Sequence, residues 1–165
     1  MTAQTNETAA RNAALSPTVI QPDDGRTLCA FGDTIQLKLG AEQTGGRLAV
    51  GLGIVEPGSG PPPHLHRNED ELFIVAEGTM SFLVNGEWLD LGPGGVAFMP
   101  RGAPHTFKNR SSSTVRQWIL TTPSGFETFF GRCGEVFAAA GAQGPDMARI
   151  MQIAAEHGIE FLPPK

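Results

Sequence analysis

The 165-residue sequence contains no tyrosine and only two cysteines. Without tyrosine, no mechanism can use a tyrosine as its acid, and a phenolic ligand loses one common hydrogen-bond partner. Cys29 and Cys133 lie far apart and have no C-x-x-C spacing. They can form one bridge, but two reduced thiols in a cytoplasmic protein are the favoured interpretation.

The sequence also lacks long apolar segments and concentrations of basic residues. No run approaches the roughly 20 apolar residues that a membrane helix requires. The N-terminal stretch MTAQTNETAARNAALSP has no apolar core of the kind found in signal peptides. With a net charge of -5 and scattered Lys and Arg, there is no basic stripe for a phosphate backbone. We therefore expect a soluble, cytoplasmic protein that binds neither a membrane nor nucleic acid.

Glycine and proline are abundant, with 21 and 13 residues. This composition predicts many turns and many short strands. Asn85-Gly86 is the strongest hairpin signal, because both residues tolerate the positive φ of a type I′ turn. Short strands without intervening helices indicate a sandwich or barrel. The predicted strands are residues 27–31, 34–39, 47–55, 71–77, 79–84, 87–91, 96–99, 105–109 and 114–121.

Near the C-terminus the spacing of apolar residues changes from that of strands to that of helices. Ser124 and Glu127 have the spacing of a capping box in which Ser124 is the N-cap. An apolar stripe at helical spacing follows, and such a stripe indicates core packing more often than a ligand site: Phe126, Phe129, Phe130, Cys133, Val136, Phe137 and Ala140. A second helix is predicted between Gly144-Pro145 and Gly158. Its inward residues are expected to be Met147, Ile150, Met151 and Ala154.

These observations divide the chain into three parts. Residues 1–16 are expected to be a mobile N-terminal arm. Residues 17–122 form the barrel, and residues 123–165 form a helical extension packed on the barrel and closing one end. A chain of this length corresponds to one globular domain.

Three of the four histidines fall in two short segments bounded by turn residues. His64 and His66 flank Leu65, and residues two apart on an extended strand point to the same face. Glu71 follows a four-residue stretch that can form a hairpin and return the carboxylate to that face, and His105 lies on a later strand. Three neutral imidazoles and one carboxylate suit a divalent transition metal ion. Taken alone, the His-x-His pair fits two polar residues on an exposed strand face better than a metal site.

The spacing around these residues resembles the two signature motifs of the cupin superfamily. The first motif is Gly58, five residues, His64-Leu65-His66, four residues, Glu71, six residues and Gly78. The second is Gly94, five residues, Pro100-Arg101-Gly102, two residues, His105, three residues and Asn109. The resemblance implies an all-β fold, the double-stranded β-helix or cupin jelly-roll barrel, here with two short C-terminal α-helices.

Carried onto this sequence, the resemblance assigns four metal ligands: His64, His66, Glu71 and His105. Fe, Mn, Ni and Co are all compatible with this ligand set. Glu69 and Asp70 are rivals for the carboxylate ligand, but the motif spacing favours Glu71 and leaves Glu69 in an exposed turn. His157, near a helix C-terminus, fits a contact with the helix dipole better than a catalytic role.

Residues 31–33, 40–44 and 125–130 resemble segments that flank the barrel in single-domain, quercetinase-like cupins. This resemblance implies a metal-dependent dioxygenase for a small aromatic or enolisable substrate. Glu71 either stays a ligand or accepts the substrate proton as general base. Two other classes remain open: a metal-dependent isomerase, decarboxylase or lyase, and a non-enzymatic cupin that binds a small ligand or a metal.

Strand alternation places Phe73 and Val75 on the face of Glu71, and Phe107 on the face of His105. These three residues are expected to line an apolar pocket, or else simply to fill the barrel. Trp118 is expected outside the barrel, at a subunit interface or under the C-terminal helices, unless a bulge shifts the register and buries it. We expect a homodimer.

Overall fold

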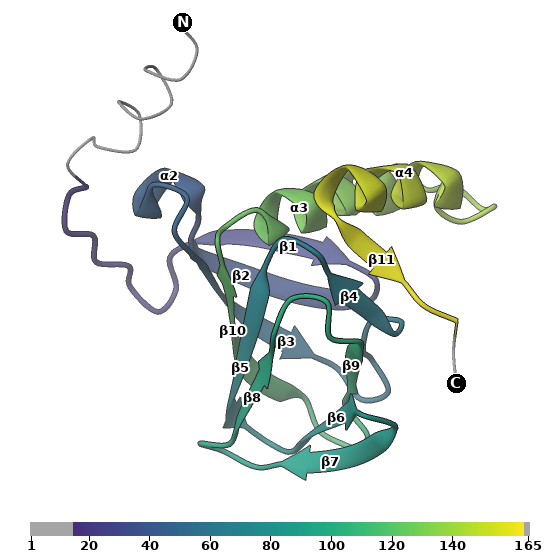
Figure 1. Cartoon of the computed structure of the whole chain (residues 1–165), viewed down its shortest axis with the longest axis horizontal. Helices are drawn as coiled ribbons and strands as arrows, with labels where there is room; N and C mark the ends of the chain where they lie inside the picture. The colour runs from purple at the N-terminus through teal and green to yellow at the C-terminus, as the bar shows by residue number, and fades with distance from the viewer. Residues whose placement is uncertain (1–14, 164–165) are drawn as a thin grey trace, which may run out of the picture.

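The computed structural model describes residues 15–163, in which eleven strands form two antiparallel sheets that face each other across a barrel (Figure 1). The strand order is β1-β2-β3-β10-β5-β8 in one sheet and β11-β4-β9-β6-β7 in the other. This arrangement confirms the predicted all-β jelly-roll fold. The N-terminal arm predicted for residues 1–16 lies outside the described residues, apart from its last two positions.

The strands match the predicted segments closely. The six-stranded sheet contains Arg26–Ala30 (β1), Asp33–Leu39 (β2), Ala49–Val55 (β3), Val115–Thr122 (β10), Asp70–Glu77 (β5) and Val96–Met99 (β8). The five-stranded sheet contains Ile159–Phe161 (β11), His64–His66 (β4), His105–Lys108 (β9), Met80–Val84 (β6) and Glu87–Leu91 (β7). The helices are Ala41–Thr44 (α2), Phe126–Ala138 (α3) and Met147–His157 (α4).

Two-residue turns with positive φ set the register of two hairpins. Asn85 and Gly86 have φ of 53° and 86°, which confirms the predicted turn between β6 and β7. The hairpin of β1 and β2 turns at Phe31 and Gly32, with φ of 55° and 83°. Phenylalanine rarely adopts this left-handed conformation, so its surroundings must hold it there.

The hydrophobic core lies between the inner faces of the two sheets. Buried and partly buried residues alternate along β3, β5 and β10, as expected for strands with one face in the core. Phe73, Phe82 and Met80 are among its largest fully buried side chains. Trp118 lies on the outward face of β10, directly between Leu52 and Ile74 of the neighbouring strands.

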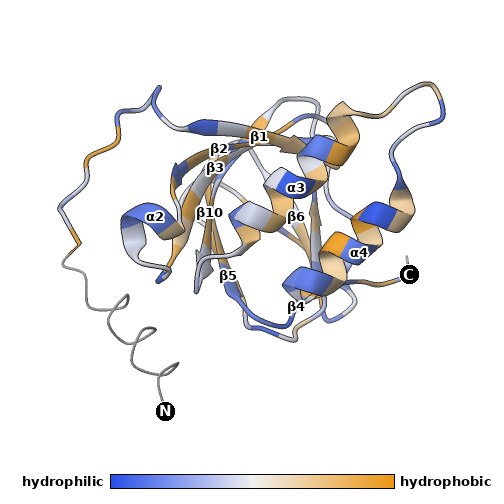
Figure 2. Ribbon diagram, turned by 90° about the horizontal axis from the view of Figure 1, so that it is seen from above, coloured by the Kyte–Doolittle hydropathy of each residue, from blue (hydrophilic) through white to orange (hydrophobic). Residues whose placement is uncertain are grey.

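The helices α3 and α4 lie over one end of the barrel (Figures 1 and 2). The predicted N-cap of α3 was wrong, because Gly125 rather than Ser124 occupies that position and no side chain caps it. Glu127 does reach back, and its Oε2 accepts a hydrogen bond from the backbone N–H of Gly125 at 2.7 Å. Its Oε1 accepts another from the N–H of Ala41 at 3.0 Å, which ties α3 to α2.

The inward face of α4 differs from the prediction at two positions. Ile150 and Ala154 are buried as expected, but Met147 and Met151 are 54% and 48% exposed. Ile153 is buried instead, so the buried face of α4 consists of Ile150, Ile153 and Ala154. Asp146 caps α4 by accepting a hydrogen bond from the N–H of Arg149, and Gly158 ends the helix with a φ of 71°.

The chain continues past Gly158 into a strand that the sequence did not predict. β11 pairs with β4, and its residues Ile159 and Phe161 lie opposite His66 and His64. In Figure 1 this strand descends from α4 beside β4. The C-terminal segment thereby completes one edge of the five-stranded sheet. Among residues 15–163, no helix has both the length and the apolar character needed to cross a membrane.

Candidate metal centre

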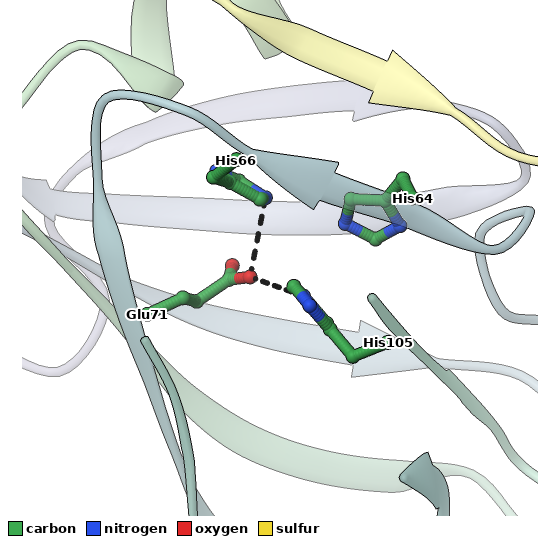
Figure 3. A group of neighbouring side chains, drawn as sticks. All are labelled: His64, His66, Glu71 and His105. Atoms are coloured by element: carbon green, nitrogen blue, oxygen red, sulfur yellow. Dashed lines mark hydrogen bonds and ion pairs between the residues drawn. The ribbon is translucent and has the colours of Figure 1, made fainter. Parts of the chain in front are cut away.

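Three strands bring the predicted ligands to one point inside the barrel. His64 and His66 lie two residues apart on β4, and His64 is paired directly with His105 on β9. Glu71 lies on β5 in the opposite sheet and points toward the three imidazoles (Figure 3). Each side chain offers one ligand atom such that all four atoms lie within 4.8 Å of one another, and all four residues are buried.

Polar groups behind the rings orient each imidazole. The Nδ1 of His64 lies 2.8 Å from the carbonyl oxygen of Pro62. The Nδ1 of His105 lies 2.9 Å from the carbonyl oxygen of Ala103. A carbonyl oxygen can only accept, so Nδ1 of each ring carries a proton, and Nε2 is the nitrogen that faces the centre of the cluster. The Nδ1 of His66 lies 3.5 Å from Oε2 of Glu69.

Glu71 is the acidic centre of the cluster. Its Oε2 lies 3.0 Å from Nε2 of His105 and 3.3 Å from Nε2 of His66. Burial raises the pKa of Glu71, but the neighbouring His66 and His105 outweigh it and hold that pKa below its usual range. Its carboxylate is therefore ionised at neutral pH, which is the form that binds a metal.

The imidazoles differ in their affinity for protons. Burial, together with the charges of His105 and His66, lowers the pKa of His64 to about 3. Burial also opposes protonation of His66, but the negative charges of Glu71 and Glu69 raise its pKa above the usual value. His64 is therefore neutral and ready to bind a metal near neutral pH, whereas protons compete more strongly with a metal ion for His66.

Two expectations about the connection between β4 and β5 were wrong. It is not a hairpin, because β4 and β5 belong to different sheets and the chain crosses the barrel between them. Glu69 does not lie in an exposed turn, because its side chain folds inward against His66 and the residue is only 3% exposed. Asp70 instead faces outward, where Arg101 pairs with it at 2.9 Å and lowers its pKa to about 2.

The residues present fit a divalent transition metal. Both ring nitrogens of His66 are buried without a hydrogen-bond partner in the described part of the chain. The nearest carboxylate oxygens, Oε2 of Glu69 and of Glu71, lie 3.5 and 3.3 Å away, beyond the usual hydrogen-bond distance, and a metal ion on Nε2 would supply a direct partner. Three imidazoles and one carboxylate also leave coordination positions open for another ligand.

A cavity of about 40 Å³ adjoins the cluster and is lined in part by His64 and Glu71. Seven phenylalanines of the described chain contribute to its wall: Phe31, Phe73, Phe107, Phe126, Phe129, Phe130 and Phe161. Phe73 and Phe107 were predicted to line a pocket. Val75 is buried in the core but is not among the residues that line this cavity, and its role in substrate binding stays a prediction.

Two other residues complete the comparison with the sequence. Asp33 lines the same cavity. It belongs to the flanking segment 31–33, but its sequence position assigned it no role in the site. His157 lies outside the cluster at the end of α4, where its Nε2 is 3.0 Å from a guanidinium nitrogen of Arg132.

Comparisons with known proteins agree with this geometry. The family described as Cupin domain matches residues 51–120. Quercetin 2,3-dioxygenase of Bacillus subtilis is 27% identical over 121 residues, which cover 73% of this chain and 36% of the dioxygenase. The chain therefore spans about a third of the length of that relative.

Solved structures show the same barrel. The polyketide cyclase RemF of Streptomyces resistomycificus superimposes with a TM-score of 0.58 at 25% identity, over 66% of this chain and 81% of the cyclase. A predicted oxalate decarboxylase of Thermotoga maritima gives a TM-score of 0.60 at 18% identity, over 64% of this chain and 99% of that protein. The second likeness is one of fold alone.

Proposed function

Because this chain belongs to the cupin superfamily, we propose that it is a metal-dependent dioxygenase of the quercetinase type, acting on a small aromatic or enolisable substrate. The observation that carries the proposal is the convergence of His64, His66, His105 and Glu71 beside a cavity walled by phenylalanines. The likeness to quercetin 2,3-dioxygenase over 73% of this chain supports the choice of reaction class.

The side chains around the cavity suggest how each would contribute. An Fe, Mn, Ni or Co ion held by the cluster would act as a Lewis acid and lower the pKa of an enol or phenol hydroxyl group. Glu71 is the ionised carboxylate at that point and would either stay a ligand or accept the hydroxyl proton as general base. The phenylalanine rings would exclude water and hold the substrate in one orientation.

The size of the cavity constrains this reaction. About 40 Å³ accommodates a few water molecules, and a ring-sized ligand needs more room. Phe126, Phe129 and Phe130 belong to α3, and Phe161 belongs to β11. Helix α3 lies over one end of the barrel and β11 forms the adjoining edge of the five-stranded sheet, so substrate entry would require their side chains to move.

Oxygen uptake tests the proposal directly. The protein is loaded separately with Fe, Mn, Ni and Co, and oxygen consumption is followed with quercetin and with 2,4-pentanedione, a small enolisable diketone. The proposal predicts that at least one metal form consumes oxygen with substrate, and that Glu71→Ala loses this activity. Substrate conversion by the metal-loaded protein at an unchanged rate without oxygen would overturn it.

That contrary result would support a second candidate, an oxygen-independent reaction of an enolisable substrate on the same barrel. The 25% identity to a polyketide cyclase over 66% of this chain favours this alternative. A metal-loaded protein that is inert toward every substrate would instead favour a ligand-binding or metal-storing cupin.

A further inference from the structure

Asp33 is a buried carboxyl group that no structural interaction explains. It is 6% exposed and lines the cavity beside the metal cluster. Its Oδ1 is buried and has no hydrogen-bond partner among residues 15–163. Burying an unpaired carboxyl group costs free energy, and an apolar residue at this position would avoid the cost. A ligand group in the cavity that hydrogen-bonds to the Asp33 carboxyl would offset this cost.

The surroundings of Asp33 leave it able to accept or donate a hydrogen bond. Burial raises its pKa to about 7, so both protonation states are populated near neutral pH. His64 and Glu71 are the other titratable residues that line the cavity, and no lysine or arginine of the described chain does so. A neutral donor such as a hydroxyl group is therefore the ligand group best suited to Asp33.

The backbone holds Asp33 firmly at the cavity wall. It begins β2 directly after the Phe31-Gly32 turn and is paired with Ala30 on β1. The Phe31 ring packs against Phe129 and Phe130 with ring centroids 6.2 Å apart in both pairs, and these contacts hold the left-handed turn in place. Asp33 is thus presented by a rigid hairpin rather than by a loop.

Asp33 and the metal ligands approach the cavity from different directions. Glu71 lies on β5, and two strands, β3 and β10, separate it from β2 in the same sheet. Three strand spacings correspond to about 14 Å along the sheet. His64 belongs to the opposite sheet. The side chains of Asp33 and Glu71 both line the cavity between the sheets, so the gap between them is shorter than this spacing. A small molecule admitted by movement of the phenylalanine rings would face the cluster with one oxygen and Asp33 with another polar group.

We propose that Asp33 is a specificity-determining residue that binds a hydroxyl group of the substrate while another oxygen of the same molecule faces the four-residue cluster. The inference rests on the proposed function and narrows it to ring-sized or smaller substrates with two oxygen groups on opposite sides of an apolar skeleton.

Binding of simple phenols to the Co(II)-loaded protein tests this assignment without turnover. Under anaerobic conditions, visible absorption of Co(II) reports whether a phenol reaches the cluster. Resorcinol is compared with m-cresol, and hydroquinone with p-cresol, so that a methyl group replaces only the second hydroxyl group. The wild type is expected to bind at least one diphenol about tenfold more tightly than the matching cresol.

The variants then separate Asp33 from general effects. Asp33→Leu should remove the preference for the diphenol, and Asp33→Asn, which keeps one acceptor oxygen, should retain part of it. Gln117→Leu is the matched control, because Gln117 is buried with both side-chain polar atoms unpaired but does not line the cavity. Its preference should equal that of the wild type. If Asp33→Leu fails to fold, the test rests on Asp33→Asn. The supporting result is then a ratio of diphenol to cresol affinity at least threefold smaller in Asp33→Asn than in the wild type.

Two outcomes overturn different claims. If the phenols change the Co(II) spectrum but the diphenol preference is the same in wild type and in the folded Asp33 variants, the assignment of Asp33 is wrong and the metal site stands. If Co(II) does not bind, or no phenol changes its spectrum, the proposed function fails and the inference fails with it.

Discussion

The imidazoles of the candidate metal centre owe their orientation to groups that would not touch the metal. Backbone carbonyls face Nδ1 of His64 and His105, whereas a carboxylate, that of Glu69, faces Nδ1 of His66. A carboxylate behind a ligating histidine fixes the ring and increases its basicity. Glu69 is thus a positioning residue for His66.

Replacing Glu69 by Gln should weaken binding of a divalent metal by about 10–100-fold. The neighbouring Asp70→Asn is the control, because Asp70 pairs with Arg101 and faces away from the cluster. Metal affinity is measured by competition with a chelator of known affinity. Equal affinity in Glu69→Gln and Asp70→Asn would contradict the positioning role.

Asp33 should make stability depend on pH in a way that Asp33→Asn does not. The folded protein raises the pKa of Asp33 from 3.8 to about 7, so the native state holds this proton more tightly than the unfolded chain does. Ionisation of Asp33 therefore lowers the wild-type free energy of unfolding as pH rises from about 4 to about 7, by at most about 4 kcal/mol.

Urea unfolding of both proteins at pH 4.5 and pH 8 checks this prediction. The free energy of unfolding of Asp33→Asn minus that of the wild type should be larger at pH 8 than at pH 4.5. A stability difference that is the same at both pH values would show that Asp33 is not abnormally protonated in the folded protein.

Spacing in the sequence was sufficient to predict the ligands but not the residues around them. His64, His66, Glu71 and His105 stand at fixed intervals, and short strands carry such intervals directly into space. The roles of Glu69 and Asp33 depend on which way a loop turns and on which carboxyl group is left unpaired. Those features arise only when distant strands pack together.

At the scale of elements, β11 supports the strand that carries two of the ligands. It pairs with β4 along its whole length, and Phe161 also lines the cavity. The sequence after Gly158 is too short to show a strand period, and the pairing partner lies more than 90 residues away. This element could therefore be recognised only from the structure.

Phe161→Ala should lower the free energy of unfolding by about 1–3 kcal/mol, because it removes a partly buried ring from the core and enlarges the cavity. Glu160→Ala is the matched control on the same strand, since the Glu160 side chain pairs with the exposed Arg67 and with no other side chain among residues 15–163. Thermal or urea unfolding measures both. Equal destabilisation by the two substitutions would contradict a packing role for Phe161.

The helix predictions were more accurate for α3 than for α4, and both were wrong at a helix end. The stripe on α3 was predicted correctly at Phe129, Phe130 and Cys133, which are all buried. It was wrong at Ala140, which lies beyond the end of α3 and is exposed. Its N-cap was displaced because Glu127 satisfies the backbone of Gly125 and Ala41 together, and this contact depends on α2. Residues at helix ends respond to such tertiary contacts more than residues in the middle do.

On the scale of the whole molecule, a row of apolar side chains crosses the outer face of the six-stranded sheet from β3 to β8. Leu52, Trp118, Ile74 and Val96 are successive cross-strand neighbours on β3, β10, β5 and β8. On β8, which lies at the edge of the sheet, Val96 and Phe98 are 55% and 58% exposed. Exposed apolar surface of this extent is typical of an interface.

The homodimer predicted from the sequence stays a prediction, and this face is where it should form. Light scattering coupled to size exclusion should give a mass of twice 17.5 kDa for the wild type. Phe98→Lys should shift it toward the monomer. Leu89→Lys on β7, at the edge of the other sheet, should leave it unchanged. A monomeric wild type would contradict the prediction.

The central claim is that His64, His66, Glu71 and His105 hold one divalent transition metal ion. Elemental analysis by inductively coupled plasma mass spectrometry, on purified wild type and on His64→Ala/His66→Ala, tests it most directly. We predict close to one equivalent of Fe, Mn, Ni or Co in the wild type and its loss in the double variant. A wild-type protein that retains no metal after reloading with each of these ions would contradict the account.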